Sequence, residues 1–379
     1  MARPSDVTKT QLKHEQWLCE IAALPTAAGR EQRVVEWVET WVRRRKGVKL
    51  THDRAGNLLL KSESVTHRNP IVFEAHLDHP AFVVVEPSDG DRVTAQFRGG
   101  VQESYFTGTG VWLHHANGDR TAGTVTDYAP GPEGSGDGLP VNRATIALES
   151  AAPANVGDIV TWRVEGPRVD RRADRFVSPV CDNLASVAAA LCAFDRLRAG
   201  ERDVRVLLSR AEEVGFIGAI AAAKQGAIPA ASRVIVLENS RSFADSPIGA
   251  GPIIRVGDRT STFDPDLTYR IGRVAELLGA DDEAFQYQRK LMPGGTCNAS
   301  AYQAFGLAAA CVCLPLGNYH NMDESTGRIA AEEISIADFH RLVRLLVSIG
   351  QKLDDDRTAP RLRERLERLF AARRKLLEE

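Results

Sequence analysis

The chain has 379 residues, of which 43% are hydrophobic and 26% are charged. This is enough apolar material for a buried core, and the length suits two domains of about 150 residues each. The 48 Lys and Arg residues nearly balance the 50 Asp and Glu residues, for a formal net charge of −2, so no basic excess points to nucleic acid or to an anionic membrane surface.

The N-terminal segment and the cysteine usage both bear on where the protein works. The first 17 residues, MARPSDVTKTQLKHEQW, lack the apolar core of a secretory signal. No apolar run reaches the roughly 18 residues that a membrane helix needs. Six cysteines are spread along the chain without CxxC spacing, which is typical of reduced thiols rather than a disulfide framework. We therefore expect a cytoplasmic protein with no membrane partner.

The first 82 residues predict two helices, a hairpin and a buried strand. Apolar residues recur at helical spacing around Trp17 and again around Trp37. The turn residues Asp53–Asn57 separate two short β-prone runs, as in a hairpin. The apolar run Ile71–Ala75 then predicts a short buried strand.

Between residues 83 and 175, short β-prone runs alternate with glycine-rich turns, and no segment predicts a helix. This spacing favours a small all-β barrel or sandwich. A long Gly/Pro-rich loop, Ala129–Pro140, interrupts the series. The first predicted strand begins just before this region. The predicted strands are Ala81–Val85, Val93–Phe97, Gly110–His114, Ala122–Asp127, Ala144–Leu148 and Ile159–Val164.

From residue 176 to residue 379, strands alternate with helices, which indicates an α/β layer. We therefore expect one α/β domain built from residues 1–82 and 176–379, with a barrel-like domain, 83–175, inserted into it. The charged tail Arg357–Glu379 predicts a solvated amphipathic helix, with an oligomer contact as the alternative. The predicted strands are Val204–Ser209, Arg233–Leu237 and Ala308–Leu314, and the predicted helices are Asn183–Leu197, Gly218–Lys224, Leu267–Leu278 and Ala331–Leu353.

Side chains that can bind metal ions follow several of these strands. In open α/β sheets, ligands bind at the carboxyl ends of the strands, so we expect these side chains to converge. Imidazole and carboxylate donors suit Zn²⁺, Co²⁺ or Mn²⁺. The residues concerned are His76, Glu212, Glu213, Glu238 and His320, with Asp182 at a predicted helix start.

Two ions about 3.5–4 Å apart can share a bridging carboxylate, and Asp182 is the candidate bridge. Glu212 and Glu213 are adjacent and leave their strand in different directions. One of them can therefore bind a metal ion while the other acts as a general base on the attacking water. The sequence thus predicts a hydrolase with two divalent ions.

Other readings of the sequence have less support. Cys181 could be a nucleophile, but no positioned Cys–His pair is apparent. The chain has no GxSxG segment, and Gly294-Gly295-Thr296 is not followed by Gly-Lys-Ser/Thr as in a P-loop. A non-catalytic protein that binds metal or peptide remains the alternative from another class, although such a protein would not need a general base.

The ordered series of motifs resembles the M42 family of metallo-aminopeptidases, which is related to the M28 and M20 peptidases. The resemblance covers most of residues 15–350 and implies a mixed-sheet, zinc-aminopeptidase-like α/β domain with an inserted small β barrel. The segments that carry it are AHLDHPAF (75–82), SPVCDN (178–183), AEEVG (211–215), GAGPIIRVGD (249–258), GGTCNASA (294–301) and GNYHNMDE (317–324).

The resemblance also implies roles for individual residues. His76, Asp182 and Glu238 would bind one ion, and Asp182, Glu213 and His320 the other. Glu212 would be the general base, and Asp78 would orient His76. The expected ion is zinc, with cobalt or manganese as alternatives. Members of the family remove N-terminal residues from peptides and form large homo-oligomers; a related di-metal amidohydrolase, acting on acylated amino acids or C-terminal residues, is the alternative activity.

Several positions depart from the family pattern without removing a proposed ligand. Glu238 stands where the family usually has Asp, and Asn183-Leu184 replaces Asp-Arg after the bridging position. Cys297-Asn298 replaces the Asp-Ala of the GGTDA motif. His79 replaces an acidic residue, and Asn318 replaces an Arg. These changes indicate a divergent member with its own substrate preference.

Overall fold

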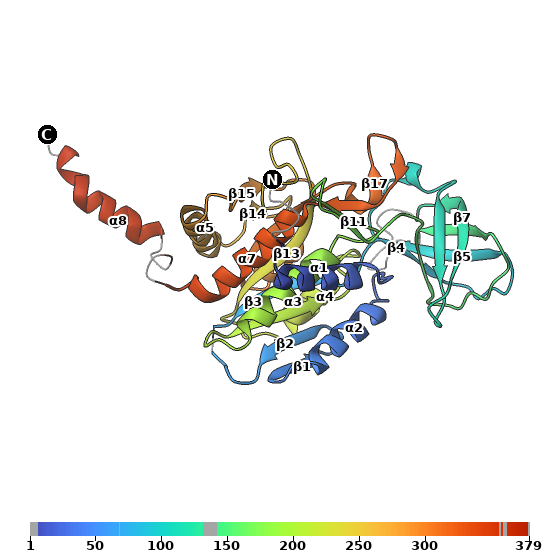
Figure 1. Cartoon of the computed structure of the whole chain (residues 1–379), viewed down its shortest axis with the longest axis horizontal. Coiled ribbons are helices and arrows are strands. Elements are labelled where there is room, and N and C mark those ends of the chain that lie inside the picture. Colours follow the sequence, from blue (N-terminus) through green and yellow to red (C-terminus); the bar gives the residue numbers. More distant parts are fainter. Residues whose placement is uncertain (1–6, 68, 132–141, 356–357, 359–361, 378–379) are drawn as a thin grey trace.

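The chain folds into a large mixed β-sheet flanked by helices and a separate closed β-barrel (Figure 1). The computed structural model describes residues 7–67, 69–131, 142–355, 358 and 362–377. This arrangement confirms the predicted α/β architecture with a barrel-like β unit. The division at residues 82/83 and 175/176 stays a prediction.

The central sheet has eight strands in the order β1-β2-β12-β3-β13-β16-β14-β15. Its four middle strands are parallel, and β2 and β14 pair with them in the antiparallel sense. Every residue of β3 and β12 is buried, as expected for parallel strands covered on both faces. The strands are β1 (Val48–His52), β2 (Leu58–Ser62), β3 (Ile71–His76), β12 (Val204–Ser209), β13 (Arg233–Arg241), β14 (Ile253–Gly257), β15 (Gln288–Leu291) and β16 (Ala308–Leu316).

Helices cover both faces of this sheet because successive strand residues point to opposite sides. Phe73 packs in the core shared with α1, α2, α3, α5 and α7, whereas its neighbour Val72 packs with α4 and α6. The helices are α1 (Lys9–Ala22), α2 (Gln32–Arg43), α3 (Leu184–Leu197), α4 (Ile217–Lys224), α5 (Pro265–Asp281), α6 (Asn298–Ala304) and α7 (Ile336–Lys352).

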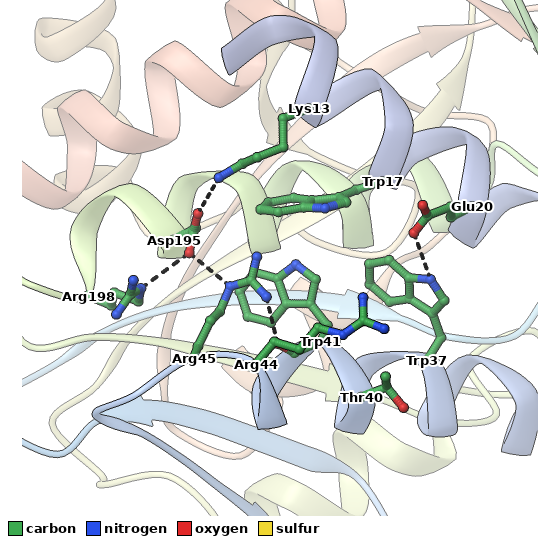
Figure 2. Close-up of a pocket in the computed structure, with 10 residues that line it drawn as sticks. All are labelled: Lys13, Trp17, Glu20, Trp37, Thr40, Trp41, Arg44, Arg45, Asp195 and Arg198. Carbon is green, nitrogen blue, oxygen red and sulfur yellow. Dashed lines mark hydrogen bonds and ion pairs between the residues drawn. The ribbon is translucent and has the colours of Figure 1, made fainter. Parts of the chain in front are cut away.

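One carboxylate ties the first three helices together (Figure 2). Asp195 on α3 accepts from Lys13 Nζ at 2.9 Å, from Arg45 Nε at 2.9 Å and from Arg198 Nε at 3.2 Å. The Arg45 guanidinium also lies 3.4 Å from the ring centroid of Trp41, a cation–π contact. These residues line a surface pocket of about 550 Å³. Within it, Lys13, Arg45 and Arg198 all contact the carboxylate of Asp195.

The barrel closes in the order β4-β5-β8-β7-β6-β9. Buried and half-buried residues alternate along β5, β6 and β8, so one side of each strand faces the barrel core. Four aromatic side chains fill that core: Phe82, Phe97, Phe106 and Trp162. The strands are β4 (Ala81–Val84), β5 (Arg92–Arg98), β6 (Gly110–His114), β7 (Arg120–Ala129), β8 (Arg143–Leu148) and β9 (Ile159–Trp162), with a 3₁₀ turn, η2, at Glu103–Tyr105.

The structure corrects the prediction of a single helix over Ala331–Leu353. Glu332–Ile334 is a strand, β19, that pairs with β11 (Arg175–Ser178), itself paired with β10 (Arg168–Asp170). The helix α7 starts only at Ile336, because the Ser335 side chain caps it by accepting from the Asp338 backbone N–H. Glu332–Ile334 instead alternates between buried and half-buried side chains, as a strand does.

The structure also extends one predicted strand and contains elements that the sequence did not predict. Strand β13 continues through Glu238 to Arg241, whereas the sequence predicted its end at Leu237. Most of the predicted Gly/Pro-rich loop lies in residues 132–141, outside the described part of the chain. Elements that the sequence did not predict include β10, β11, β14, β15, α6, and two short strands beyond the 3₁₀ turn η3 (Tyr319–Asn321), namely β17 (Met322–Asp323) and β18 (Arg328–Ile329).

The C-terminal helix α8 (Leu362–Arg373) extends away from the rest of the chain and is followed by a 3₁₀ turn, η4 (Arg374–Leu377) (Figure 1). It has no buried residue, and Leu362, Leu366, Leu369 and Phe370 are 45–60% exposed. Among the described residues, no helix is long and apolar enough to span a bilayer.

We predict that the aromatic core is a main source of the barrel's stability. Phe97 is fully buried and contacts the rings of Phe82 and Phe106 at centroid distances of 4.8 Å. Phe97→Ala should lower the free energy of unfolding by about 3–5 kcal/mol, measured by urea denaturation with tryptophan fluorescence. Val156→Ala, at a site 59% exposed, should change it by less than about 0.5 kcal/mol; equal effects would contradict the prediction.

Candidate metal centre

Six polar side chains from separate elements line one pocket of about 490 Å³. His76 is the last residue of β3, Asp182 lies two residues before α3, and Glu238 lies inside β13. Glu212 and Glu213 follow β12, and His320 lies in η3 after β16. The sequence predicted each of these residues for one site, and the structure brings all six together.

Their donor atoms form two groups of three that share Asp182. In the first, His76 Nε2 lies 3.5 Å from Asp182 Oδ1 and 3.5 Å from Glu238 Oε2. In the second, His320 Nε2 lies 3.7 Å from Asp182 Oδ2 and 3.5 Å from Glu213 Oε1. Donor atoms about 2.1 Å from a tetrahedral ion are about 3.4 Å apart, so both groups have the spacing of a metal site.

Two carboxylate oxygens in these groups have no hydrogen-bond partner although they are buried. They are Asp182 Oδ1 and Glu238 Oε1. A buried polar atom without a partner is costly, and such atoms are rare in folded proteins. Asp182 directs one oxygen to each group. Both oxygens belong to residues of the group with His76, so a cation bound there would give them a partner.

Both imidazoles are oriented through their Nδ1 atoms. His320 Nδ1 lies 2.6 Å from the Gly100 carbonyl oxygen, which belongs to the loop after barrel strand β5. His76 Nδ1 lies 3.1 Å from the Asp78 carbonyl oxygen. A carbonyl can only accept, so each Nδ1 must donate. In the neutral imidazole, Nε2 then carries the lone pair that a metal ion could use.

Burial and mutual repulsion set the electrostatics of the pocket. Burial raises the pKa values of Glu212 and Glu213 well above the usual range, and neighbouring carboxylates add to this effect. Burial also raises the pKa of Asp182 to about 6 and lowers that of His320 to about 3. Burial disfavours protonated His76, but the surrounding carboxylates raise its pKa well above the usual value. The shifts of His76 and the carboxylates reflect burial together with a concentration of negative charge that bound cations would relieve, whereas the shift of His320 reflects its burial.

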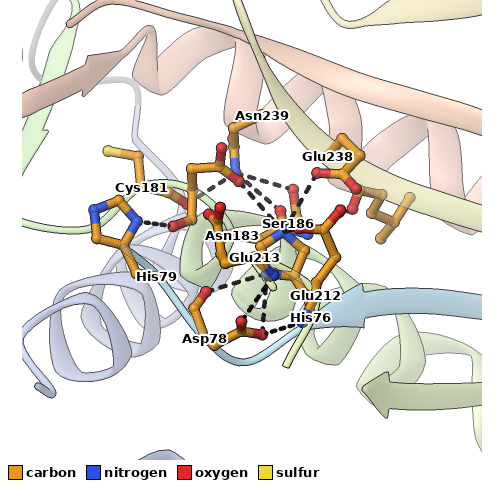
Figure 3. A network of polar contacts seen from close by, with 12 residues as sticks. His76, Asp78, His79, Cys181, Asn183, Ser186, Glu212, Glu213, Glu238 and Asn239 are labelled. Carbon is orange, nitrogen blue, oxygen red and sulfur yellow. Dashed lines mark hydrogen bonds and ion pairs between the residues drawn. The ribbon is translucent and has the colours of Figure 1, made fainter. Parts of the chain in front are cut away.

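Asp78 fixes the position of the Glu212–Glu213 segment (Figure 3). Its Oδ1 accepts from the Glu212 backbone N–H and its Oδ2 from the Glu213 N–H, each at 3.0 Å. The Asp78 carboxylate lies 3.6 Å from His76 Nδ1, farther than the carbonyl oxygen of the same residue. Asp78 thus orients His76 through its backbone and the two glutamates through its side chain.

Glu332, a residue that the sequence did not single out, joins the Asp182 and His320 segments. Its Oε2 accepts from the backbone N–H groups of Cys181 at 2.7 Å and Asp182 at 2.9 Å, and its Oε1 from that of His320 at 2.9 Å. Burial raises its pKa to about 8, although the backbone donors oppose this shift. The prediction of a helix over this strand concealed the role of Glu332.

Further contacts from the divergent positions support the same loops. His79 Nδ1 contacts the Asp182 carbonyl oxygen, and its Nε2 lies 3.0 Å from Asn321 Oδ1. Asn183, joined to Asp182 by a cis peptide bond, donates to the Leu237 carbonyl oxygen at 2.7 Å. Polar contacts inside the protein therefore replace the acidic side chains that the family pattern has at these two positions.

Backbone strain is concentrated in the same loops. Ala211 precedes Glu212 and has φ 54°, His320 itself has φ 55°, and its neighbours Asn318 and Asn321 have φ 51° and 64°. Non-glycine residues rarely adopt this left-handed region, and they do so mostly where the surrounding structure enforces it. The strain therefore coincides with the segments that deliver the donor atoms.

Cys181, the alternative nucleophile, does not reach the pocket in a reactive form. Its side chain is fully buried, and burial raises the pKa of the thiol well above its usual value. A thiol in this state is a poor nucleophile.

We predict that Glu332→Gln destabilises the fold. The new amide NH₂ would face backbone N–H groups, and a buried donor left without an acceptor costs about 1–3 kcal/mol of unfolding free energy. Urea denaturation measures the loss. Glu333→Gln is the matched control, because the neighbouring side chain is 36% exposed and pairs only with Arg175 at 3.5 Å; this exposed pair is worth less than about 1 kcal/mol. Equal losses in the two variants would exclude the bridging role of Glu332.

Comparisons with known proteins show which solved structures share this fold. The chain is similar in structure to an aminopeptidase from the archaeon Desulfurococcus kamchatkensis (TM-score 0.74, 19% identity, 90% of this chain and 95% of that chain). It is also similar to a TET aminopeptidase from a marine sediment Thaumarchaeota archaeon (TM-score 0.74, 17% identity, 91% and 98%). The Pyrococcus horikoshii TET1 peptidase gives a TM-score of 0.71 at 18% identity, over 90% and 99% of the two chains. These likenesses show a shared fold.

No curated protein matches the chain. The sequence profile of the M42 glutamyl aminopeptidases, however, matches residues 56–335. That stretch is well over half of the 379 residues and contains all six pocket residues described above. The chain therefore belongs to the M42 glutamyl aminopeptidase family and is a peptidase.

Proposed function

We propose that this peptidase removes N-terminal residues from peptides by hydrolysis that depends on two divalent metal ions. The observation that carries the proposal is the pair of donor groups joined by Asp182, whose two oxygens face different groups. His76, Asp182 and Glu238 would hold one ion, and Asp182, Glu213 and His320 the other. Nitrogen and oxygen donors of this kind suit zinc, with cobalt or manganese as alternatives.

Two bound ions would supply a Lewis acid that makes water more acidic and polarises the scissile carbonyl. Glu212 would take the proton from the attacking water and return it to the leaving amine. Its Oε2 lies 3.9 Å from His76 Nε2, at the edge of the donor groups.

Glu212 could instead be a ligand, because it forms a third possible group with His76 and Glu213. We assign it as the base because the two groups joined by Asp182 already supply three protein donors each. Three donors leave a position open at each ion, as catalytic sites require. Asp78 would be a positioning residue, since it holds the Glu212 and Glu213 backbone.

We also propose that the protein works as a homo-oligomer in a reducing, cytoplasmic environment. The Pyrococcus horikoshii TET1 peptidase assembles into a tetrahedron or a large octahedral shell. The exposed apolar residues of α8 give this chain additional surface for contacts between subunits. All six cysteines are free thiols, which supports a reducing compartment.

We predict that the purified protein, incubated with Zn²⁺, binds about two metal equivalents per chain. His320→Ala removes one donor from the second group only and should lower the content to about one equivalent. Elemental analysis after desalting measures both values. His115→Ala is the control, because this histidine contacts Thr121 on the barrel instead, and the variant should keep two equivalents. No bound metal in the unmodified chain would refute the di-metal proposal.

We predict that Glu212→Gln retains the metal ions but lowers kcat by at least roughly a hundredfold, the usual scale for a general base. The assay compares release of the first residue from peptides with a free and with an acetylated N-terminus. Glu149→Gln, a change in an exposed ion pair with Arg163, is the control. Near-normal turnover in Glu212→Gln would remove the base assignment, and cleavage of acetylated peptides alone would favour an amidohydrolase.

A further inference from the structure

We propose that Tyr319 is a catalytic residue whose phenol O–H donates a hydrogen bond to the oxygen of the scissile carbonyl as negative charge develops there. This inference rests on the proposed function, because it requires the scissile peptide bond to lie at the metal ligands. It assigns the donor to one hydroxyl of the pocket wall, and it separates that role from the packing of the same ring on His320.

Tyr319 lies directly before His320 in the 3₁₀ turn η3 and lines the pocket of the candidate metal centre. Its ring stacks on the His320 imidazole, with the ring centroids 3.8 Å apart and an angle of 22° between the planes. His320 Nε2 in turn lies 3.7 Å from Asp182 Oδ2 and 3.5 Å from Glu213 Oε1. The phenol ring is therefore held beside the second group of donor atoms.

Among the described residues, three side-chain hydroxyls line this pocket, and two of them already have partners. Ser240 Oγ accepts from a terminal nitrogen of Arg255 at 3.3 Å, and Thr296 Oγ1 is hydrogen-bonded to Thr260 Oγ1. Tyr319 Oη makes no hydrogen bond within the part of the chain that the structure describes, and Tyr319 is half-buried. Its O–H is therefore available to a molecule bound in the pocket.

The phenol is an uncharged donor in a pocket rich in carboxylates. A phenol is protonated at neutral pH. Burial raises the pKa of Tyr319 further, and the nearby carboxylates of Asp182, Glu213 and Glu212 add to this shift. These carboxylates are close enough to act on the phenol, but none of them accepts its hydrogen. The O–H therefore keeps its hydrogen for an acceptor that enters the pocket.

Arg241 holds the phenol ring by a second contact. Its guanidinium lies 5.6 Å from the centroid of the Tyr319 ring, within the range of a cation–π contact. Arg241 lines the same pocket but pairs with Glu324 at 2.6 Å, so its charge is already neutralised. Between them, Arg241 and the His320 imidazole restrict the ring, whereas the hydroxyl stays without a partner.

The proposed hydrolysis supplies the acceptor. The water oxygen bonds to the carbonyl carbon, the carbonyl oxygen takes the electron pair of the double bond, and Glu212 takes the water proton. The C–N bond then breaks, the carbonyl forms again, and the proton passes to the leaving amine. Tyr319 transfers no proton. Its hydrogen bond is stronger to the charged oxygen than to the neutral carbonyl, so it stabilises the transition state more than the bound substrate.

Tyr319→Phe tests the proposal, because it removes the hydroxyl and keeps the ring that packs on His320. We expect kcat for a peptide with a free N-terminus to fall by about a hundredfold, the lower end of the scale for losing one oxyanion donor. KM and metal content should stay nearly unchanged, since the bond is made in the transition state. Tyr128→Phe is the matched control: Tyr128 stacks on Phe106 of the barrel at 3.6 Å, and losing its hydroxyl should leave kcat unchanged.

The binding of two peptide analogues separates a catalytic role from a structural one. A phosphinic analogue has a tetrahedral, negatively charged group in place of the scissile amide, whereas a reduced-amide analogue has CH₂ in place of the carbonyl. Titration calorimetry on metal-loaded Tyr319→Phe should show weaker binding of the phosphinic analogue, by about the same factor as the loss in kcat/KM, and unchanged binding of the reduced amide. The pH profile of kcat/KM should keep its shape, because Tyr319 transfers no proton.

The inference and the proposed function fail in different ways. If the metal-loaded protein cleaves no peptide with a free N-terminus, the proposed function is wrong and the inference falls with it. If the protein cleaves such peptides and Tyr319→Phe keeps near-normal turnover, Tyr319 is not the donor. Equal weakening of both analogues, or loss of metal, would leave Tyr319 only a packing role beside His320. Loss of one limb of the pH profile would instead make it a proton-transfer group.

Discussion

The structure depends on concentrating Asp182, Glu212, Glu213 and Glu238 around two imidazoles in one pocket, where each carboxylate side chain is at most 10% exposed. Each carboxylate loses hydration and repels the next, which the raised pKa values of three of them record. The protein places no Lys or Arg ion pair against these groups among the described residues. The buried oxygens without partners instead mark where positive charge must come from outside the chain.

Because these carboxylates repel one another, other groups must fix the backbone segments that carry them. Two carboxylates outside the pocket lining do so. Glu332 clamps the segments that carry Asp182 and His320, and Asp78 clamps Glu212 and Glu213. Each does so by accepting from backbone N–H groups, so the contact fixes the chain path rather than a side-chain rotamer. Left-handed conformations at Ala211 and His320 are tolerated because these clamps hold the backbone N–H groups of His320 and of the two residues that follow Ala211.

The sequence predicts much of this arrangement because strand periodicity and the convergence of parallel strands at one edge are local rules. They located His76, Glu212, Glu213 and His320 correctly relative to their strands. These local rules failed where contacts between residues distant in sequence determine the secondary structure. Glu238 was expected at a strand end but projects from inside β13, and β19 was taken for helix because its pairing with β11 is remote in sequence.

The hydrogen bond between His320 and Gly100 makes the barrel part of the active centre. A carbonyl oxygen contributed by the inserted unit fixes which nitrogen of a proposed metal ligand carries the proton. The barrel is therefore not independent of the candidate site, because deleting it would remove the carbonyl oxygen that orients His320.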